Sequence, residues 1–291
     1  MKRRSFIQIA GLGSLSAMAF RNMNAFFQNG NIKENKSIFE EIIQKAKKGE
    51  WKELQIGDLI IKIAMEFIGT PYVGGTLEGE PEMCRVDLTG MDCVTFYEYS
   101  LCFARVIKLG KENYQDLVNE LTYVRYRDGV LGDYSTRLHY TSDWIDNNVK
   151  KYVVEDVSKE IGGEIYDLHV DFMSIHPQYY PALKDDPAMV KKIAEIENDI
   201  NSRTHYYIPK RKVKRTEQFM EKGDIIAIAT NIKGLDYSHT GLAYAEEQNI
   251  TRFFHASSKK KKVTLDVRLY QYMSGISSNI GISVARPVFT L

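Results

Sequence analysis

The sequence predicts an α+β fold, with helices in the N-terminal half and an antiparallel sheet in the C-terminal half. Residues 37–48 and 58–67 repeat apolar side chains every three or four positions, which is typical of helices packed on a core. From Gly223 onward, short apolar runs alternate with polar links, a pattern of strands and turns. Sequential strands with short connections favour an antiparallel meander, so helices first and sheet second indicate one α+β domain.

A third helix is predicted to begin at Cys93, directly after Thr89-Gly90 breaks the chain. Asp92 is a good N-cap, which places the cysteine in the first helical turn. Unpaired N–H groups and the helix dipole favour negative charge there, so we expect a thiol pKa below the value of about 8.5 for a free cysteine. The alternative is that Cys93 is a small buried apolar residue, as most lone cysteines are.

The later elements follow from the same patterns. Residues 105–124 continue helical in character with an interruption at Gly110, and residues 191–201 form a polar helix. Five strands are predicted, at residues 224–229, 238–245, 251–256, 262–267 and 280–286. The basic run 259–262 is interpreted as a solvated hairpin turn.

Composition limits the classes of function. The 291 residues carry 39 Lys and Arg against 38 Asp and Glu, so no global field favours nucleic acid or an anionic membrane as a partner. The three cysteines are too few for a disulfide scaffold, and their spacing matches no common zinc pattern. A Cys84–Cys102 disulfide is the less favoured alternative, because Cys102 has the setting of a core residue. We expect no metal and no cofactor.

The N-terminus has the features of an export signal. Lys2-Arg3-Arg4 precedes an apolar run that ends in Ala17-Met18-Ala19, a small-residue cleavage pattern. We therefore expect residues 1–19 to be a signal peptide, of twin-arginine or Sec type, and the mature protein to be periplasmic or extracellular, with no membrane anchor. Residues 20–36 are predicted to be a flexible linker, and residues 37–291 a single catalytic domain enlarged at about 100–220.

Two histidines are predicted to meet on neighbouring strands. If the chain reverses about Glu247, His239 and His255 are equidistant from the turn and lie directly opposite each other. Opposed residues share a face, with Cβ atoms about 4.5–5.5 Å apart, so the two rings can form a hydrogen bond. With Cys93 they would provide a nucleophile, its base and the group that orients the base. Zinc binding by these three residues is an alternative, but no fourth ligand stands at a recognisable spacing.

Several motifs, in order, resemble the NlpC/P60 papain-like cell-wall hydrolases: Gly69-Thr70-Pro71-Tyr72-Val73-Gly74-Gly75, Asp92-Cys93, Gly223-Asp224-Ile225-Ile226, His239-Thr240-Gly241 and Phe254-His255-Ala256-Ser257. Together with Arg137-Leu138-His139-Tyr140 they more closely resemble the DUF1460 branch, described as N-acetylmuramoyl-L-alanine amidase-like. The resemblance implies a papain-like fold with family-specific insertions. The match departs from the common pattern at Val94 and Thr95, where serine and glycine are usual, and in the long charged loop 76–88.

The resemblance implies a cysteine amidase that cuts between N-acetylmuramic acid and L-alanine in muropeptides. Catalysis would fall on Cys93, His239 and His255, and Tyr72 would be the active-site tyrosine. We expect substrate contacts from Tyr72, Asp92, Arg137, His139 and Tyr140, and a monomeric enzyme. For His139 beside Tyr140, a sugar or peptide ledge and a purely structural histidine are equally open. The remaining alternatives are a γ-D-glutamyl-diamino acid endopeptidase and a non-catalytic wall-binding module.

Overall fold

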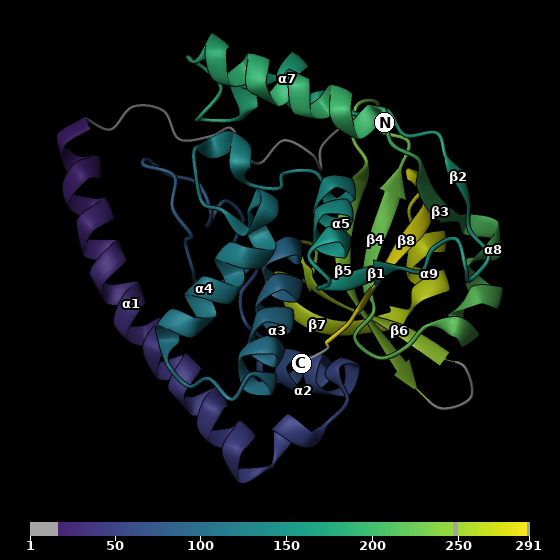
Figure 1. The fold of residues 1–291 in the computed structure, drawn as a ribbon, viewed down its shortest axis with the longest axis horizontal. Coiled ribbons are helices and arrows are strands. Elements are labelled where there is room, and N and C mark those ends of the chain that lie inside the picture. The colour runs from purple at the N-terminus through teal and green to yellow at the C-terminus, as the bar shows by residue number, and fades with distance from the viewer. Residues whose placement is uncertain (1–16, 247–249, 290–291) are drawn as a thin grey trace.

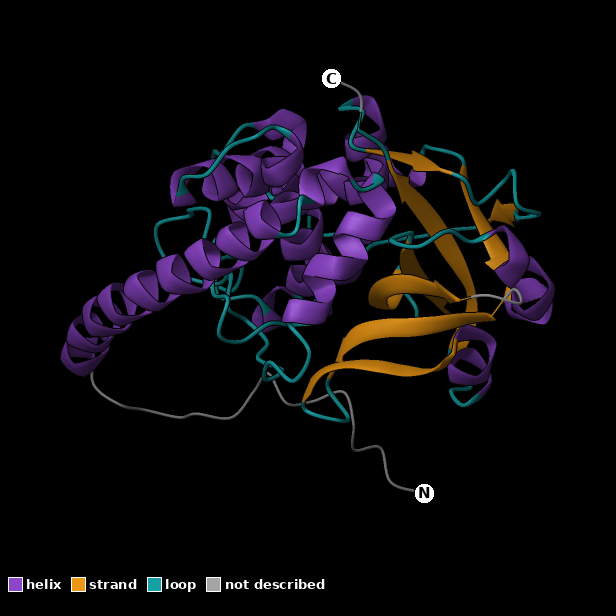
Figure 2. Cartoon of the chain, turned by 90° about the horizontal axis from the view of Figure 1, so that it is seen from below, coloured by secondary structure: helices purple, strands orange, loops and turns teal. Residues whose placement is uncertain are grey.

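The computed structural model describes residues 17–246 and 250–289, as a sheet with helices on both faces (Figure 1). The larger helices pack on one face and two short helices cover the other, as the view from below shows (Figure 2). The predicted α+β class with an antiparallel sheet is confirmed.

The helices are α1 (Ala17–Lys48), α2 (Ile56–Glu66), α3 (Cys93–Lys108), α4 (Tyr114–Arg125), α5 (Thr141–Lys150), α6 (Phe172–Ile175), α7 (Pro187–Asn201), α8 (Lys210–Thr216) and α9 (Leu269–Ser274). Helix α1 begins well before the expected cap at Ser37, so residues 20–36, expected to be a linker, are helical. They contain no proline that would break the helix. Most of the expected signal peptide, residues 1–16, lies outside the described residues. Within the described part, no helix combines the length and apolarity needed to cross a bilayer.

The strands are β1 (Val154–Asp156), β2 (Glu164–Tyr166), β3 (His205–Pro209), β4 (Ile225–Thr230), β5 (Tyr237–Glu246), β6 (Ile250–Ser257), β7 (Lys262–Arg268) and β8 (Asn279–Pro287). The five predicted C-terminal strands are confirmed. Their order is not a simple meander, because β8 returns to pair with β4 instead of following β7. The sheet also gains β1, β2 and β3 from the stretch that was expected to be an insertion.

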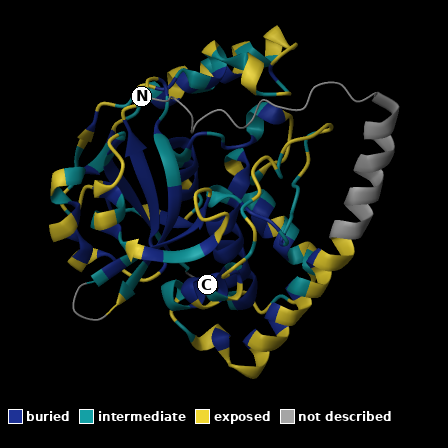
Figure 3. Cartoon of the chain, turned by 180° about the vertical axis from the view of Figure 1, so that it is seen from behind, coloured by how far each residue is buried: buried dark blue, intermediate teal, exposed yellow. Residues whose placement is uncertain are grey.

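The core lies on both faces of this sheet, where Figure 3 shows the most deeply buried residues. Leu242 and Phe254 face the larger helices, and the Phe254 ring lies 5.1 Å from that of Phe96 in α3. Phe253 faces the other way, in a cluster with Leu269 and Met273 of α9. Because strand side chains alternate, this also decides which face each histidine occupies.

A buried ion pair fixes α3 to α4 beneath the sheet. Arg125 Nε donates to Glu98 Oε2 at 2.8 Å, and both side chains are almost completely buried. Trp144 Nε1 also donates to Glu98, at 3.1 Å, and Arg125 donates to the backbone carbonyl of Arg85, at 2.7 Å. The network thus ties the loop before Cys93 to three helices.

Candidate active site

Cys93 is the first residue of α3, as predicted, and Asp92 is its N-cap. The Asp92 carboxylate accepts hydrogen bonds from the backbone N–H of Val94 at 3.1 Å and of Thr95 at 2.9 Å. Thr95 returns the bond, because its hydroxyl accepts from the Asp92 N–H at 2.9 Å. This reciprocal capping box holds the cysteine in the first turn. Asp92, expected to contact substrate, therefore uses one carboxylate oxygen to cap the helix.

The charge state of the thiol differs from expectation. Burial raises the pKa of Cys93 to about 11, and the adjacent Asp92 carboxylate contributes to the increase. The hydroxyl and backbone of Thr240 lie beside the sulfur and oppose this effect only in part. Burial therefore outweighs the helix N-terminus, and the resting thiol keeps its proton at neutral pH.

The glycine loop before α3 brings Tyr72 to the same place. Tyr72 forms a parallel bridge with Met91, and its backbone N–H donates to the Lys261 carbonyl at 3.0 Å. Burial raises the pKa of the Tyr72 hydroxyl, and the nearby Cys93 and Asp92 add to the shift. Within the described residues, this hydroxyl has no hydrogen-bond partner. The expected active-site tyrosine therefore lies next to the cysteine with its polar group free.

The two histidines meet, although not in the predicted register. Leu242 pairs with Phe254, which centres the hairpin one residue later than Glu247 and places Gly241, not His239, opposite His255. The residue opposite His255 is thus two positions from the predicted one, and residues two apart on a strand point to the same face. Both rings therefore still share one face. His239 Nε2 and His255 Nδ1 are 2.6 Å apart. A Cβ atom at position 241 would lie 2.7 Å from the Phe253 ring, which explains the glycine between them.

Asp266 of β7 is a residue that the sequence analysis missed. Its Oδ2 lies 3.2 Å from His255 Nε2, and its Oδ1 accepts from Lys260 Nζ at 2.8 Å. Thr264 pairs with His255, and the register then shifts by one extra residue of β7 between Leu265 and Arg268, where Asp266 lies. An acidic residue in a predicted strand next to that of His255 is the signal that could have identified it.

The sulfur and the histidine pair are linked by the residues that lie between them. Thr240 lies beside the sulfur and directly follows His239. Tyr272 of α9 is close enough to Cys93 for the thiolate charge to raise its pKa further, beyond the effect of burial, and its ring stacks 6.1 Å from that of His239. No hydrogen bond joins Cys93 to either histidine in the described part of the chain. The rings lie on the α9 face, and Cys93 approaches from the N-terminal end of α3.

Both histidines are neutral at rest. Burial lowers the pKa of His239 to about 3, with a contribution from His255. Burial also lowers the pKa of His255 to about 4, although Asp266 acts in the opposite direction. The site therefore combines a protonated thiol with an unprotonated base, which is a general-base arrangement and not a preformed ion pair.

The three remaining substrate-contact predictions fall on residues whose polar groups serve the fold. Arg137 is buried and donates to the Leu77 carbonyl and the Glu78 carboxylate, each at 2.9 Å, which anchors the loop 76–88. His139 Nε2 donates to the Tyr134 carbonyl at 2.8 Å. The Tyr140 hydroxyl donates to Glu197 at 2.7 Å in a separate core. Of the two readings left open for His139, these contacts support the structural one.

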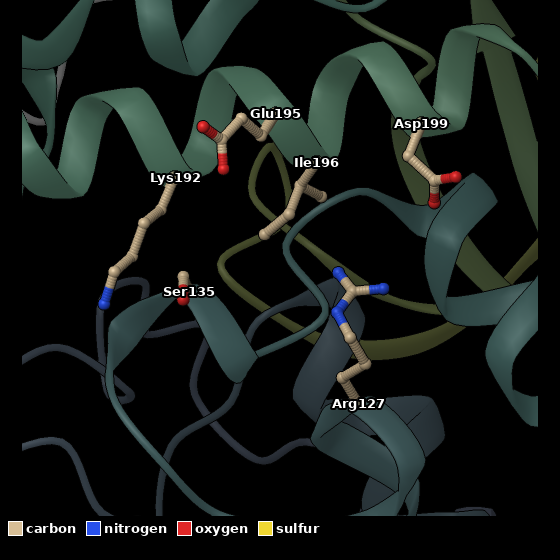
Figure 4. A pocket seen from close by; sticks show the side chains of 6 residues that line it. All are labelled: Arg127, Ser135, Lys192, Glu195, Ile196 and Asp199. Atoms are coloured by element: carbon tan, nitrogen blue, oxygen red, sulfur yellow. The ribbon is translucent and has the colours of Figure 1, made fainter.

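Neither a metal site nor the surface groove beside α7 provides a competing centre. No three His, Cys, Asp or Glu side chains of the described residues are grouped as metal ligands, so zinc binding has no geometric support. An open groove lies between α7 and the segment that follows α4 (Figure 4). Its cations are already paired, Arg127 with Asp143 and Lys192 with Asp133, each at 2.6 Å. The groove is therefore an ion-paired surface.

Comparison with known proteins places the chain in a family. A crystal structure of an N-acetylmuramoyl-L-alanine amidase from Bacteroides uniformis ATCC 8492 is similar at a TM-score of 0.77 and 34% identity, over 81% of this chain and 100% of that one. A Bacteroides fragilis protein named as a candidate xylanase has a TM-score of 0.71 and 35% identity, over 77% of this chain and 99% of its own. A Legionella pneumophila protein assigned to DUF1460 shares the fold, at a TM-score of 0.69 and 21% identity, over 90% and 97% of the two chains.

The curated proteins searched contain no match to this sequence. The family model described as N-acetylmuramoyl-L-alanine amidase-like, AmiA-like, matches residues 62–282, which is most of the chain. The chain therefore belongs to the N-acetylmuramoyl-L-alanine amidase-like family, a family of hydrolases.

Proposed function

We propose that this protein is an exported cysteine amidase that hydrolyses the bond between the lactyl group of N-acetylmuramic acid and L-alanine in muropeptides. One observation carries the proposal: in a chain of the amidase-like family, Tyr272 lies near a cysteine on a capped helix N-terminus and stacks on His239, which is joined to His255 by a 2.6 Å contact. The order of these residues supports a papain-like NlpC/P60 ancestry for the fold.

In the acylation step, Cys93 Sγ attacks the lactyl carbonyl carbon while Nδ1 of His239 takes the thiol proton. A pKa of about 11 for the thiol and about 3 for the imidazole disfavours proton transfer at rest, so transfer accompanies attack on the bound substrate. The C–S bond forms, the C–N bond to L-alanine breaks, and His239 returns the proton to the leaving amine. Catalytic hydrogen bonds that are long in the free enzyme shorten when substrate binds.

In the deacylation step, water attacks the thioester and His239 takes a proton from that water. The thiolate leaves and is protonated again, which releases the lactyl carboxylate. The backbone N–H of Cys93 has no partner in the described part of the chain, as expected in the first turn of a helix, and is free to stabilise the oxyanion. The unpartnered Tyr72 hydroxyl provides a second donor.

Glycoside hydrolysis, which the name of the Bacteroides fragilis protein suggests, finds no support in this site. Glycosidases use two carboxyl groups on either side of the scissile bond. The two carboxylates beside Cys93 and the histidine pair are already engaged, Asp92 in capping the helix and Asp266 with Lys260 and His255.

The test is mass spectrometry of N-acetylmuramoyl-tetrapeptide after incubation with the mature protein. The amidase reaction gives free N-acetylmuramic acid and an intact peptide that begins with L-alanine. Cleavage after D-glutamate would replace the proposal with an endopeptidase. Cys93→Ala should abolish hydrolysis and keep substrate binding, whereas the matched control Cys84→Ala, at another partly buried free cysteine, should retain activity. Full activity in Cys93→Ala would contradict the cysteine mechanism.

Export and the monomeric state are part of the same proposal. Arg3 and Arg4 precede an apolar run, which is the pattern of an export signal. Export would also bring the enzyme to its substrate, since peptidoglycan fragments arise outside the cytoplasm. Fractionation of cells that express the full chain should find the mature protein outside the cytoplasm. Retention of the wild type inside the cell would contradict export, and sizing by light scattering tests for a monomer.

A further inference from the structure

A chain of hydrogen bonds crosses three neighbouring strands and ends at an acidic residue. It runs from His239 on β5 to His255 on β6, at 2.6 Å, and from His255 to Asp266 on β7, at 3.2 Å. His255 is 1% exposed and Asp266 is 9% exposed, so water has little access to the inner links. Lys260, in the turn between β6 and β7, holds the other carboxylate oxygen at 2.8 Å.

The charge on Asp266 determines the direction of every bond in this chain. Burial acts to raise the pKa of Asp266, but Lys260, the Val267 N–H and His255 outweigh it and bring the pKa to about 2. An ionised carboxylate only accepts hydrogen bonds, so the Nε2 atom of His255 must carry its proton. The Nδ1 atom of His255 is then a lone pair, and it accepts from Nε2–H of His239. The Nδ1 atom of His239 is left unprotonated.

We propose that Asp266 is a positioning residue that sets the tautomers of two histidines in series, so that His239 presents a basic Nδ1 atom for the Cys93 thiol. The role of the thiol as nucleophile rests on the proposed function. The positions of the protons on the Nε2 atoms of His239 and His255 do not depend on it. Lys260 and the Val267 N–H complete the arrangement, because both donate to Oδ1 of Asp266 at 2.8 Å and leave Oδ2 to face His255.

The same arrangement stabilises His239 when it takes a proton. The imidazolium then donates from Nε2 to His255, whose far side faces the Asp266 anion. Two further titratable groups lie close to the pair: Tyr272 of α9, with its ring 5.1 Å from that of His255, and Lys260, whose charge lowers the pKa of His255. Cys93 lies near Tyr272. Within the described residues, Asp266 is thus the anion bound to this pair.

The variant Asp266→Asn tests the direction of the bonds. Lys260 would hold the amide oxygen, so the amide NH₂ would face His255 and donate to its Nε2 atom. Both rings would reverse, and His239 would carry its proton on Nδ1, unable to act as base. We expect kcat to fall by about 10³- to 10⁴-fold, as when a triad histidine is held in the wrong tautomer. Asp266→Ala should lose less activity, because it imposes no reversed bond.

Two further variants separate this role from simple stabilisation. Lys260→Met in the Asp266→Asn background removes one of the two donors to the amide oxygen and leaves only the Val267 N–H. The amide then turns more easily, which should restore part of the lost rate. Asp58→Asn, which removes the acid of the exposed Lys222–Asp58 pair at 3.0 Å, is the matched control and should leave kcat unchanged. Equal losses in Asp266→Asn and Asp266→Ala, with no rescue, would overturn the proposal.

A measurement on the unaltered enzyme needs no substrate. Nitrogen-15 NMR of histidine-labelled protein at pH 7 should show His239 and His255 both as Nε2–H tautomers, with both signals assigned by loss in His239→Gln and His255→Gln. A Nδ1–H tautomer at either ring would overturn the proposal. If the tautomers are as expected but no muropeptide is cleaved, the proposed function fails and this inference stands.

Discussion

Two histidines in different regions of this protein share one electrostatic property and differ in what surrounds them. His239 lies on the C-terminal sheet and His139 lies in the helical segment that enlarges the domain. Burial lowers the pKa of each ring to about 3. Nε2 of His139 contacts a backbone carbonyl at 2.8 Å, whereas Nε2 of His239 contacts a second histidine that is itself bound to a carboxylate.

A shifted pKa does not by itself identify a catalytic group. A backbone carbonyl can only accept, so it fixes His139 in place and offers no route for a proton. The His255 and Asp266 series instead orients His239 and stabilises its charged form. The contacts of His139 are structural, whereas those of His239 fit the proposed role of a base.

The largest effect should come from replacing His239 with glutamine, with the same change at His139 as the control. Glutamine keeps an N–H donor at the position of Nε2 and cannot act as a base. His239→Gln should reduce kcat by at least about 10³-fold, because the thiol loses its proton acceptor. His139→Gln should keep kcat within about 2-fold, because its donor to the Tyr134 carbonyl is preserved. Rates of muropeptide hydrolysis measure both effects, and comparable losses in the two variants would show that the two histidines do not differ in role.

The next largest effect concerns the ion pair beneath α3. Glu98→Gln leaves Arg125 charged, buried and without its anion, which should reduce the free energy of unfolding by about 3–5 kcal/mol. Glu41→Gln removes an exposed partner of Lys45 and should cost less than about 0.5 kcal/mol. Urea denaturation of both variants measures the difference. A loss below 1 kcal/mol in Glu98→Gln would show that the network contributes little.

A smaller effect is expected in the pH dependence of stability. The folded pKa of His139, about 3, lies below the ordinary value of 6.5, so the unfolded chain binds more protons between these pH values. The contribution of the neutral His139 ring to the free energy of unfolding is therefore complete above pH 6.5 and declines as the pH falls toward 3. His139→Gln should reduce this slope by up to about 1.4 kcal/mol per pH unit. Urea midpoints at pH 4.5 and 7 test it, and an unchanged slope would contradict the burial of this ring.

The smallest effect should appear at the helix cap. The Asp92 carboxylate contributes to the raised pKa of Cys93, so Asp92→Asn should lower that pKa while the amide oxygen still caps the helix. The rate of Cys93 alkylation by iodoacetamide, followed from pH 6 to 11, should shift to lower pH, and the melting temperature should change little. A shift to higher pH would show that the cap, not the charge, controls the thiol.

Much of the fold was predictable because its signals are local. The Asp92 cap before Cys93, the helical spacing after it and the five C-terminal strands all follow from short-range periodicity and turn residues. The shared face of His239 and His255 was also predicted correctly. The residue opposite His255 is two positions from the predicted one, and a change of two positions on a strand keeps a side chain on the same face.

Other features depended on contacts between distant residues. The exact register pairs Leu242 with Phe254, and β8 pairs with β4, which is far from it in the sequence. No local pattern encodes either pairing. Arg137 looked like a substrate ligand until the fold placed carbonyl and carboxylate acceptors around it.

Local sequence patterns were enough to assign the candidate residue Cys93 to a helix N-terminus, and His239 and His255 to two neighbouring strands. Tertiary structure alone decided that the Cys93 thiol is protonated at rest and that Asp266 completes the series behind His239. The physical reason is that caps and periodicity act over a few residues, whereas desolvation and hydrogen-bond direction depend on everything packed around a group.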